Sequence, residues 1–158
     1  GAAYVAALLE NKEKRDFRLV GAVDPQPQRC PQLSELRALD IPVFERLEEF
    51  YRRQQADLAI IASPIHFHSG QTCLALSRGS CVLCEKPAAG TVQEVHRMRE
   101  AERAAGRWVA VGFQWSFSTA IQALKNDLRA GMYGRPFRLK CLYLWPRNDA
   151  YSRRNDWA

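Results

Sequence analysis

The sequence contains no long apolar run. None of its hydrophobic stretches approaches the roughly 20 residues that a membrane-spanning helix requires, and no secretory leader is visible. Low-complexity tracts are also missing, and the composition is not that of a disordered chain. With 158 residues, the chain is long enough for one domain, or for one domain and part of another. We therefore expect a folded globular protein with no membrane partner.

The sequence also lacks an even set of cysteines. Most of its five cysteines lie in apolar stretches, which is typical of reduced, buried thiols in a cytoplasmic protein rather than of a disulfide framework: Cys30, Cys73, Cys81, Cys84 and Cys141. Cys81 and Cys84 form a C-x-x-C pattern, which can serve redox chemistry or metal binding. On a strand, however, residues three apart point to opposite faces, so the two sulfur atoms cannot converge. His66 and His68 have no Cys, Asp or Glu at ligand spacing, so we expect no metal site.

Positive charge is concentrated late in the chain. The formal net charge is +6, and the segment from Ser118 onward holds eight Lys or Arg against three Asp or Glu. A basic segment can bind nucleic acid, and such binding would depend strongly on salt. The alternative is a solvated or inter-domain face, which the scattered placement of the basic residues favours. We therefore expect no nucleic-acid partner.

Helical and strand-like apolar patterns alternate along the chain. The solid apolar runs, such as 58–62, are typical of strands buried on both faces of a parallel sheet, whereas 136–145 alternates like a strand covered on one face. The patterns predict helices over 1–10, 31–39, 47–54, 65–78, 91–105 and 121–132, and strands over 17–24, 41–44, 57–63, 81–84, 108–113 and 136–145. Thr91 and Glu94 have the spacing of a capping box. The order predicts the α/β class, with right-handed crossovers and a Rossmann-type, doubly wound parallel sheet.

Two residues near the start suit a dinucleotide cofactor. Gly1 opens the first helix, where the last glycine of a phosphate-binding fingerprint lies in a dinucleotide fold. Asp24 ends an apolar run about 20 residues later, where a carboxylate binds the ribose hydroxyls. It would repel the 2′-phosphate of NADP and so favour NAD, although Arg29 lies close enough to weaken that preference. The alternative for Asp24 is a turn aspartate before Pro25.

A charged triplet ends the strand at 81–84. Glu85, Lys86 and Pro87 follow it directly, and ligands bind at the carboxyl ends of strands in open α/β sheets. Pro87 restricts the backbone of Lys86 to an extended form, so the lysine side chain has a limited direction. Lys86 is therefore a candidate proton-transfer group. The alternative is an ion pair between Glu85 and an arginine.

Three motifs carry a family resemblance. Ser63-Pro64-x-x-x-His68, then Cys84-Glu85-Lys86-Pro87 with Gly90, then Val111-Gly112-Phe113, together resemble the Gfo/Idh/MocA oxidoreductases. The resemblance implies an N-terminal Rossmann domain and a C-terminal α/β domain with an open antiparallel sheet. It also implies hydride transfer between NAD or NADP and a sugar, polyol or related secondary alcohol or ketone.

The resemblance implies roles for single residues. Lys86 matches the catalytic lysine, and the implied cofactor-binding residues are Gly1, Asp24, Ser63, Pro64, His68, Glu85, Lys86 and Gln114. Two positions depart from the family pattern: Ser116 stands in place of a common arginine, and Ile65 stands where many members have Asn. The family's catalytic histidine and aspartate belong to the C-terminal domain, beyond Ala158.

The expected organisation is that of a piece cut from a longer protein, since the chain begins on Gly1 and ends on Ala158 without a closing element. Residues 1–117 would form a dinucleotide-binding domain that lacks its first strand. Residues 118–158 would form a linker helix and the first strand of the C-terminal domain. We expect the full-length protein to be a homo-oligomeric enzyme with a sugar or polyol substrate; the alternative is a dinucleotide-binding regulator or scaffold without turnover.

Overall fold

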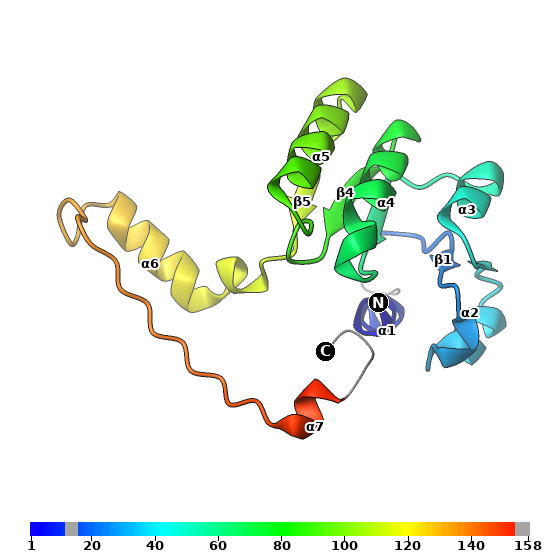
Figure 1. Ribbon diagram of the computed structural model, residues 1–158, viewed down its shortest axis with the longest axis horizontal. Helices are drawn as coiled ribbons and strands as arrows, with labels where there is room; N and C mark the ends of the chain where they lie inside the picture. Colours follow the sequence, from blue (N-terminus) through cyan, green and yellow to red (C-terminus); the bar gives the residue numbers. More distant parts are fainter. Residues whose placement is uncertain (12–15, 154–158) are drawn as a thin grey trace. The chain divides into compact units, whose positions relative to one another are not determined.

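The chain forms two compact units. The computed structural model describes residues 1–11 and 16–153, and its first unit is Gly1–Gly112, while the second begins at Phe113 (Figure 1). The domain boundary expected between 117 and 118 stays a prediction about the whole protein. Within the described residues, no helix combines the length and the apolar character needed to cross a bilayer.

Helices and strands alternate through the first unit, as the sequence predicts. The elements are α1 (Ala2–Glu10), β1 (Ala22–Val23), the short 3-10 helix η1 (Pro27–Arg29), α2 (Leu33–Ala38), β2 (Val43–Phe44), α3 (Leu47–Arg53), β3 (Leu58–Ile61), α4 (Ile65–Ser77), β4 (Cys81–Cys84), α5 (Val92–Ala105) and β5 (Val109–Val111). The strand β4 has the predicted bounds, whereas the other strands are shorter than their apolar runs, because only the residues beside a partner strand are hydrogen-bonded into a ladder.

The strands form two parallel ladders. One has the order β1-β2, with Ala22 opposite Val43, and the other has the order β3-β4-β5, with Leu58 opposite Cys81 and Val82 opposite Val109. Parallel pairing confirms the predicted fold class and places the carboxyl ends of neighbouring strands at the same edge.

The expectation that residues 58–62 form a strand buried on both faces is only partly right. Ile61 is 5% exposed, but Leu58 is 44% exposed. Among the described residues β3 pairs with β4 alone, so it is an edge strand of its ladder; Ile61 lies in the core, and Ala59 packs against the core while partly buried.

One hydrophobic core joins the two ladders. The aromatic rings of Phe44 on β2 and Phe50 on α3 meet edge to face, with centroids 5.6 Å apart. They belong to the same buried cluster as residues of β3, β4, α4 and α5: Phe44, Phe50, Tyr51, Ile61, Ala75, Leu76, Val82, Cys84 and Met98. Helices α4 and α5 pack against each other beside β4 (Figure 1). The core therefore fixes the positions of the strand ends in the first unit.

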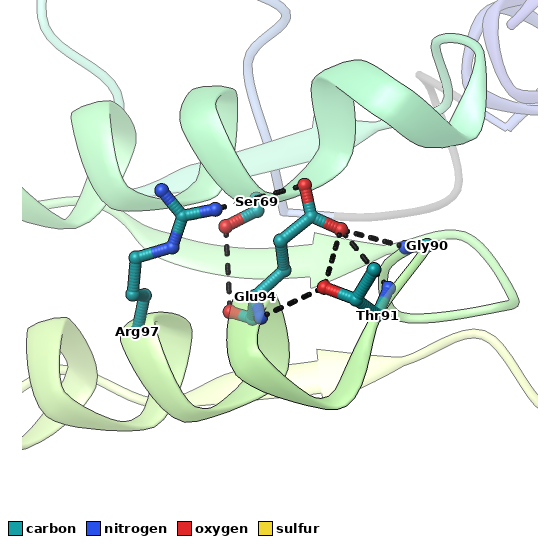
Figure 2. A network of polar contacts seen from close by, with 5 residues as sticks. All are labelled: Ser69, Gly90, Thr91, Glu94 and Arg97. Carbon is teal, nitrogen blue, oxygen red and sulfur yellow. Dashed lines mark hydrogen bonds and ion pairs between the residues drawn. The ribbon is translucent and has the colours of Figure 1, made fainter.

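The start of α5 is held by a network of polar contacts. Figure 2 shows the predicted capping box, in which Thr91 Oγ1 accepts the Glu94 N–H at 3.2 Å and Glu94 Oε2 accepts the Thr91 N–H at 3.0 Å. Glu94 Oε2 also accepts the Gly90 N–H at 3.0 Å, and Ser69 Oγ on α4 donates to the Glu94 carbonyl at 3.3 Å. Arg97 adds an ion pair to Glu94 at 3.7 Å. The network fastens the end of the β4–α5 loop to both helices.

The second unit is mainly helical where it is regular. It contains the 3-10 helix η2 (Gln114–Phe117), α6 (Thr119–Arg129) and the short α7 (Asp149–Ser152). The predicted helix over 121–132 is confirmed, with both ends two or three residues earlier. The predicted strand over 136–145 is wrong: none of those residues pairs in a ladder, and Phe137 is 98% exposed. An alternating pattern needs a neighbouring strand to become a sheet, and no described segment supplies one there.

Candidate functional site

The ends of β3, β4 and β5 form the edge that carries most of the predicted site residues. The ladder continues one residue past β4 and β5, because the Glu85 N–H donates to the Ile61 carbonyl and the Gly112 N–H donates to the Cys84 carbonyl, each at 2.8 Å. Ser63 and Pro64 follow β3 on the same edge, and Lys86 follows Glu85. The parallel ladder therefore brings together the Ser63-Pro64 corner and the Glu85-Lys86 pair.

Glu85 is anchored by a residue that sequence reasoning missed. The Tyr4 hydroxyl on α1 donates to Glu85 Oε1 at 2.8 Å, and the Lys86 backbone N–H donates to Glu85 Oε2 at 2.9 Å. Gly112 leaves the room for this contact, since a Cβ there would lie 3.3 Å from both Glu85 Oε1 and the Tyr4 hydroxyl oxygen. The alternative of a Glu85–arginine ion pair is wrong: among the described residues Glu85 forms no ion pair. A tyrosine on the apolar face of a helix needs a partner for its hydroxyl, and that need was the available signal.

Burial, together with the bond to Glu85, gives Tyr4 an unusual pKa. Burial, and next to it the hydrogen bond to Glu85, raise the pKa of Tyr4 from 10.0 to about 12. The folded state holds the phenol proton more tightly than the unfolded state does. The contribution of this proton to the free energy of unfolding is therefore complete below pH 10 and is lost as the pH rises through about 12. Tyrosinate absorbance can be followed against pH in the unmutated protein and in Tyr4→Phe. We expect the difference between the two curves to show one phenol that ionises near pH 12. If the missing phenol ionises at the ordinary value instead, Tyr4 is neither buried nor bonded to Glu85 in solution as the structure has it.

The backbone around Lys86 is held on both sides, while its side chain is exposed. The Lys86–Pro87 peptide bond is cis, and the Pro87 carbonyl lies 2.9 Å from His68 Nδ1. Glu85, which precedes Lys86, is anchored by Tyr4, and the N–H of Gly90, which follows it, donates to Glu94. Within the part of the chain that the structure describes, the Lys86 ammonium forms no ion pair. A fixed backbone with an exposed ammonium at a strand end suits a group that must meet a ligand.

His68 and Ser63 connect this loop to the end of β3. His68 is only 2% exposed, and its Nε2 lies 2.8 Å from the Ser63 carbonyl oxygen. Ser63 Oγ donates to Gln71 Oε1 at 2.7 Å, and Pro64 is the exposed N-cap of α4. The expected cofactor contact through a ring nitrogen of His68 has a competitor here, since both nitrogens already face protein carbonyls. The ring of His68 lies between the loop that follows β3 and the loop that follows β4.

Asp24 and Gly1 lie on other elements of the first unit. Asp24 follows β1, is exposed, and accepts the Gln26 N–H on Oδ1 at 2.8 Å. The turn at Asp24, which the sequence offered as an alternative to ribose binding, is thus present. The Asp24 carboxylate can still accept further hydrogen bonds, because a carboxylate accepts more than one. Gly1 is the N-cap of α1, and no side-chain hydrogen bond caps the helix there. Tyr4, one turn into α1, joins this helix to Glu85, whereas no hydrogen bond of the described residues joins Asp24 to the Lys86 edge.

The last predicted site residue is Gln114, and the two other features that the sequence suggested are the C-x-x-C pair and a metal site. Gln114 is exposed on η2, in the second unit. On β4, burial raises the pKa of the Cys84 thiol, which keeps it protonated and a poor nucleophile, against a redox role for the C-x-x-C pair. Among the described residues, no three His, Cys, Asp or Glu side chains gather as a metal site would require.

Parallel strands that alternate with helices, with polar residues at the strand ends, define a Rossmann-type nucleotide-binding unit. Residues 1–113 match the family model described as "Oxidoreductase family, NAD-binding Rossmann fold". The chain therefore belongs to the Gfo/Idh/MocA oxidoreductase family.

Curated relatives of the chain are dehydrogenases. It is 31% identical over 138 residues to the 1-carboxy-3-chloro-3,4-dihydroxycyclohexa-1,5-diene dehydrogenase of Comamonas testosteroni, covering 85% of this chain and 34% of that protein. It is 30% identical over 131 residues to an inositol 2-dehydrogenase of Pseudomonas fluorescens, covering 82% of this chain and 39% of that protein. The chain thus spans little more than a third of the length of these relatives.

Solved structures show the same fold. The WlbA dehydrogenase from Bordetella pertussis, in complex with NADH and UDP-GlcNAcA, matches 84% of this chain and 39% of that one, with a TM-score of 0.72 and 25% identity. The WlbA dehydrogenase from Chromobacterium violaceum, with the same two molecules, matches 99% of this chain and 46% of that one, with a TM-score of 0.81 and 22% identity. The second likeness concerns the fold alone.

Proposed function

We propose that the protein is an NAD(P)-dependent oxidoreductase that transfers a hydride between a nicotinamide cofactor and a sugar, a polyol or a related secondary alcohol or ketone. The observation that carries the proposal is the exposed Lys86 ammonium on a backbone held at Glu85, Pro87 and Gly90. The relatives named above support a polyol or cyclic diol as the class of substrate.

The residues of the first unit fit a dinucleotide. The first turn of α1, which follows Gly1, offers backbone N–H groups to phosphate oxygens, and the exposed Asp24 offers carboxylate oxygens to ribose hydroxyls. Ser63 and Pro64 follow β3 at the edge that also carries Glu85, and the Lys86 N–H donates to Glu85 Oε2. When bound, the nicotinamide accepts or gives the hydride.

Lys86 is the proposed catalytic residue. Its ammonium donates a hydrogen bond to the alcohol or carbonyl oxygen of the substrate, and so stabilises negative charge on that oxygen as the carbon is oxidised or reduced. Glu85 is kept from swinging towards the ammonium, because its two oxygens are bound by the Tyr4 hydroxyl and the Lys86 N–H. This division leaves the ammonium to the substrate.

A turnover assay tests the proposal. The protein in its full encoded length is titrated with NADH and with NADPH, and a panel of polyols and sugars is then added with the oxidised cofactor while nicotinamide absorbance is recorded. Cofactor binding together with turnover of at least one alcohol supports the enzyme. Binding without turnover of any substrate supports a regulator or scaffold, and absence of binding overturns the proposal.

Asp24 is proposed to favour NAD over NADP, because its negative charge repels a 2′-phosphate. We expect Asp24→Asn to weaken NADH binding by about tenfold, the loss of a charged hydrogen-bond acceptor, and to leave NADPH binding equal or tighter. Asp57→Asn is the matched control, since Asp57 lies before β3, at the opposite end of that strand. Fluorescence titration of each cofactor gives the dissociation constants. Equal losses for both cofactors would refute the proposed discrimination.

The wider setting is also a proposal. We propose a cytoplasmic homo-oligomer that binds neither nucleic acid nor membrane. All five cysteines are free thiols in the structure, which supports a reducing compartment. Salt-dependent binding to duplex DNA would contradict the proposal for the basic segment after Ser118.

A further inference from the structure

Two hydrogen bonds connect α1 to the backbone of Lys86 through one carboxylate. The Tyr4 hydroxyl, in the first turn of α1, donates to Glu85 Oε1 at 2.8 Å, and the Lys86 N–H donates to Glu85 Oε2 at 2.9 Å. The backbone of Glu85 is fixed as well, because its own N–H donates to the Ile61 carbonyl at 2.8 Å. The two oxygens of this carboxylate therefore hold a helix and the loop after β4 together.

The bond from Tyr4 to Glu85 gives α1 a directional link to the rest of the first unit. Among the described residues, the other hydrogen bonds of α1 stay within residues 1–11. Leu9, near the end of the helix, is buried, but the burial of apolar surface favours no particular orientation. A hydrogen bond restricts both distance and angle. The Tyr4–Glu85 bond therefore sets where the first turn of α1 lies relative to the end of β4.

The orientation of the Glu85 carboxylate depends on the Tyr4 hydroxyl. Among the described residues, no cation forms an ion pair with Glu85, and Tyr4 is the one side chain that donates to it. Burial and the bond to Glu85 raise the pKa of Tyr4 to about 12, so the phenol stays protonated at neutral pH and remains a donor. Gly112 leaves room for the pair, because a Cβ there would lie 3.3 Å from Glu85 Oε1 and from the Tyr4 hydroxyl oxygen.

We propose that Tyr4 is a positioning residue for Lys86. Through Glu85, it fixes the backbone of the lysine relative to the first turn of α1, where the cofactor phosphates are proposed to bind. Without the hydroxyl, Glu85 Oε1 loses its donor, and the carboxylate is no longer held in the orientation that accepts the Lys86 N–H. The effect on catalysis rests on the proposed function, whereas the link from Tyr4 to the Lys86 N–H does not.

The first test does not depend on turnover. Tyr4→Phe keeps the ring and removes only the hydroxyl. In the protein in its full encoded length, we expect this change to shift the backbone amide signal of Lys86 and to speed its hydrogen exchange about tenfold, because the carboxylate that accepts this N–H is no longer held. An unshifted Lys86 amide would overturn the proposal. A crystal structure of the unmutated protein with the Tyr4 hydroxyl out of hydrogen-bond reach of Glu85 would also overturn it, even if Tyr4→Phe failed to fold.

Tyr51→Phe is the matched control. The Tyr51 hydroxyl on α3 lies 2.7 Å from Ser80 Oγ, and Ser80 precedes β4, at the opposite end of that strand from Glu85. This variant loses a hydroxyl of the same chemistry, with a hydrogen-bond partner, within the same unit. We expect both variants to lose stability, but only Tyr4→Phe to shift the Lys86 amide. An equal shift in both variants would show a general loosening of the unit and refute the specific link.

The second test separates positioning from stability. A misplacement of about 1 Å can cost a hundredfold in rate, so we expect kcat of Tyr4→Phe to fall by about tenfold to a hundredfold, with the KM for cofactor nearly unchanged. Tyr51→Phe should keep the kcat of the unmutated protein. Equal falls in kcat for the two variants would refute the positioning role. If the Lys86 amide shifts in Tyr4→Phe but the unmutated protein turns over no substrate, the proposed function is refuted instead, and the link from Tyr4 to Lys86 stands.

Discussion

Replacing Lys86 by alanine is expected to abolish turnover while cofactor binding stays nearly intact. The ammonium is exposed beyond a fixed backbone, so its loss removes the group proposed to contact the substrate oxygen without disturbing the strands. General acid–base groups contribute about 100- to 10,000-fold to rate, and we expect kcat to fall within that range. Steady-state kinetics together with a fluorescence titration of NADH measure the two quantities separately.

The control for this experiment is Lys125→Ala. Lys125 is an exposed lysine on α6 in the second unit, so its replacement removes the same charge from a unit other than the one that holds Lys86. We expect its turnover to match that of the unmutated protein. Normal turnover of Lys86→Ala would show that the lysine is not the catalytic group.

Replacing Gly112 by valine is expected to destabilise the first unit. Even a Cβ at this position would lie 3.3 Å from Glu85 Oε1 and from the Tyr4 hydroxyl, and 3.5 Å from the Cys84 carbonyl oxygen. The larger side chain must displace Tyr4 or Glu85 and break the bond between them. Overpacking of this kind costs about 1–3 kcal/mol, which denaturant unfolding detects.

Gly70→Ala supplies the opposite result in the same unit. Gly70 lies inside α4, and a Cβ there would meet nothing within 4 Å. Because alanine restricts the unfolded chain and favours the helix, we expect the free energy of unfolding to rise by about 0.4–1 kcal/mol. If Gly112→Val is as stable as the unmutated protein, the packing of Tyr4 against Glu85 and Gly112 does not exist in solution.

Local patterns predicted the elements well. The apolar run at 81–84 is the strand β4, and Thr91 and Glu94 form the predicted capping box. Each of these patterns consists of residues a few positions apart. The predicted end of β4 on Glu85 and Lys86 follows from Pro87, which needs no distant partner. Such features depend on neighbours in sequence, and the sequence alone contains them.

Contacts between distant residues were harder to predict. Tyr4 and Glu85 are 81 residues apart, and the residues around each one in the sequence do not indicate that the two form a hydrogen bond. The same holds for His68, whose ring nitrogens lie beside two backbone carbonyls, groups that any residue type provides. The strand predicted over 136–145 failed for a related reason, since a strand exists only where another lies beside it.

The central claim is that the carboxyl ends of β3 and β4 bind a nicotinamide dinucleotide beside Lys86. Hydrogen exchange of the protein in its full encoded length, with and without saturating NADH, tests it most directly. We predict that NADH slows exchange in the segments 63–68 and 84–90 and at the start of α1. Unchanged exchange in all three segments, with NADH demonstrably bound, would place the cofactor elsewhere and contradict the account.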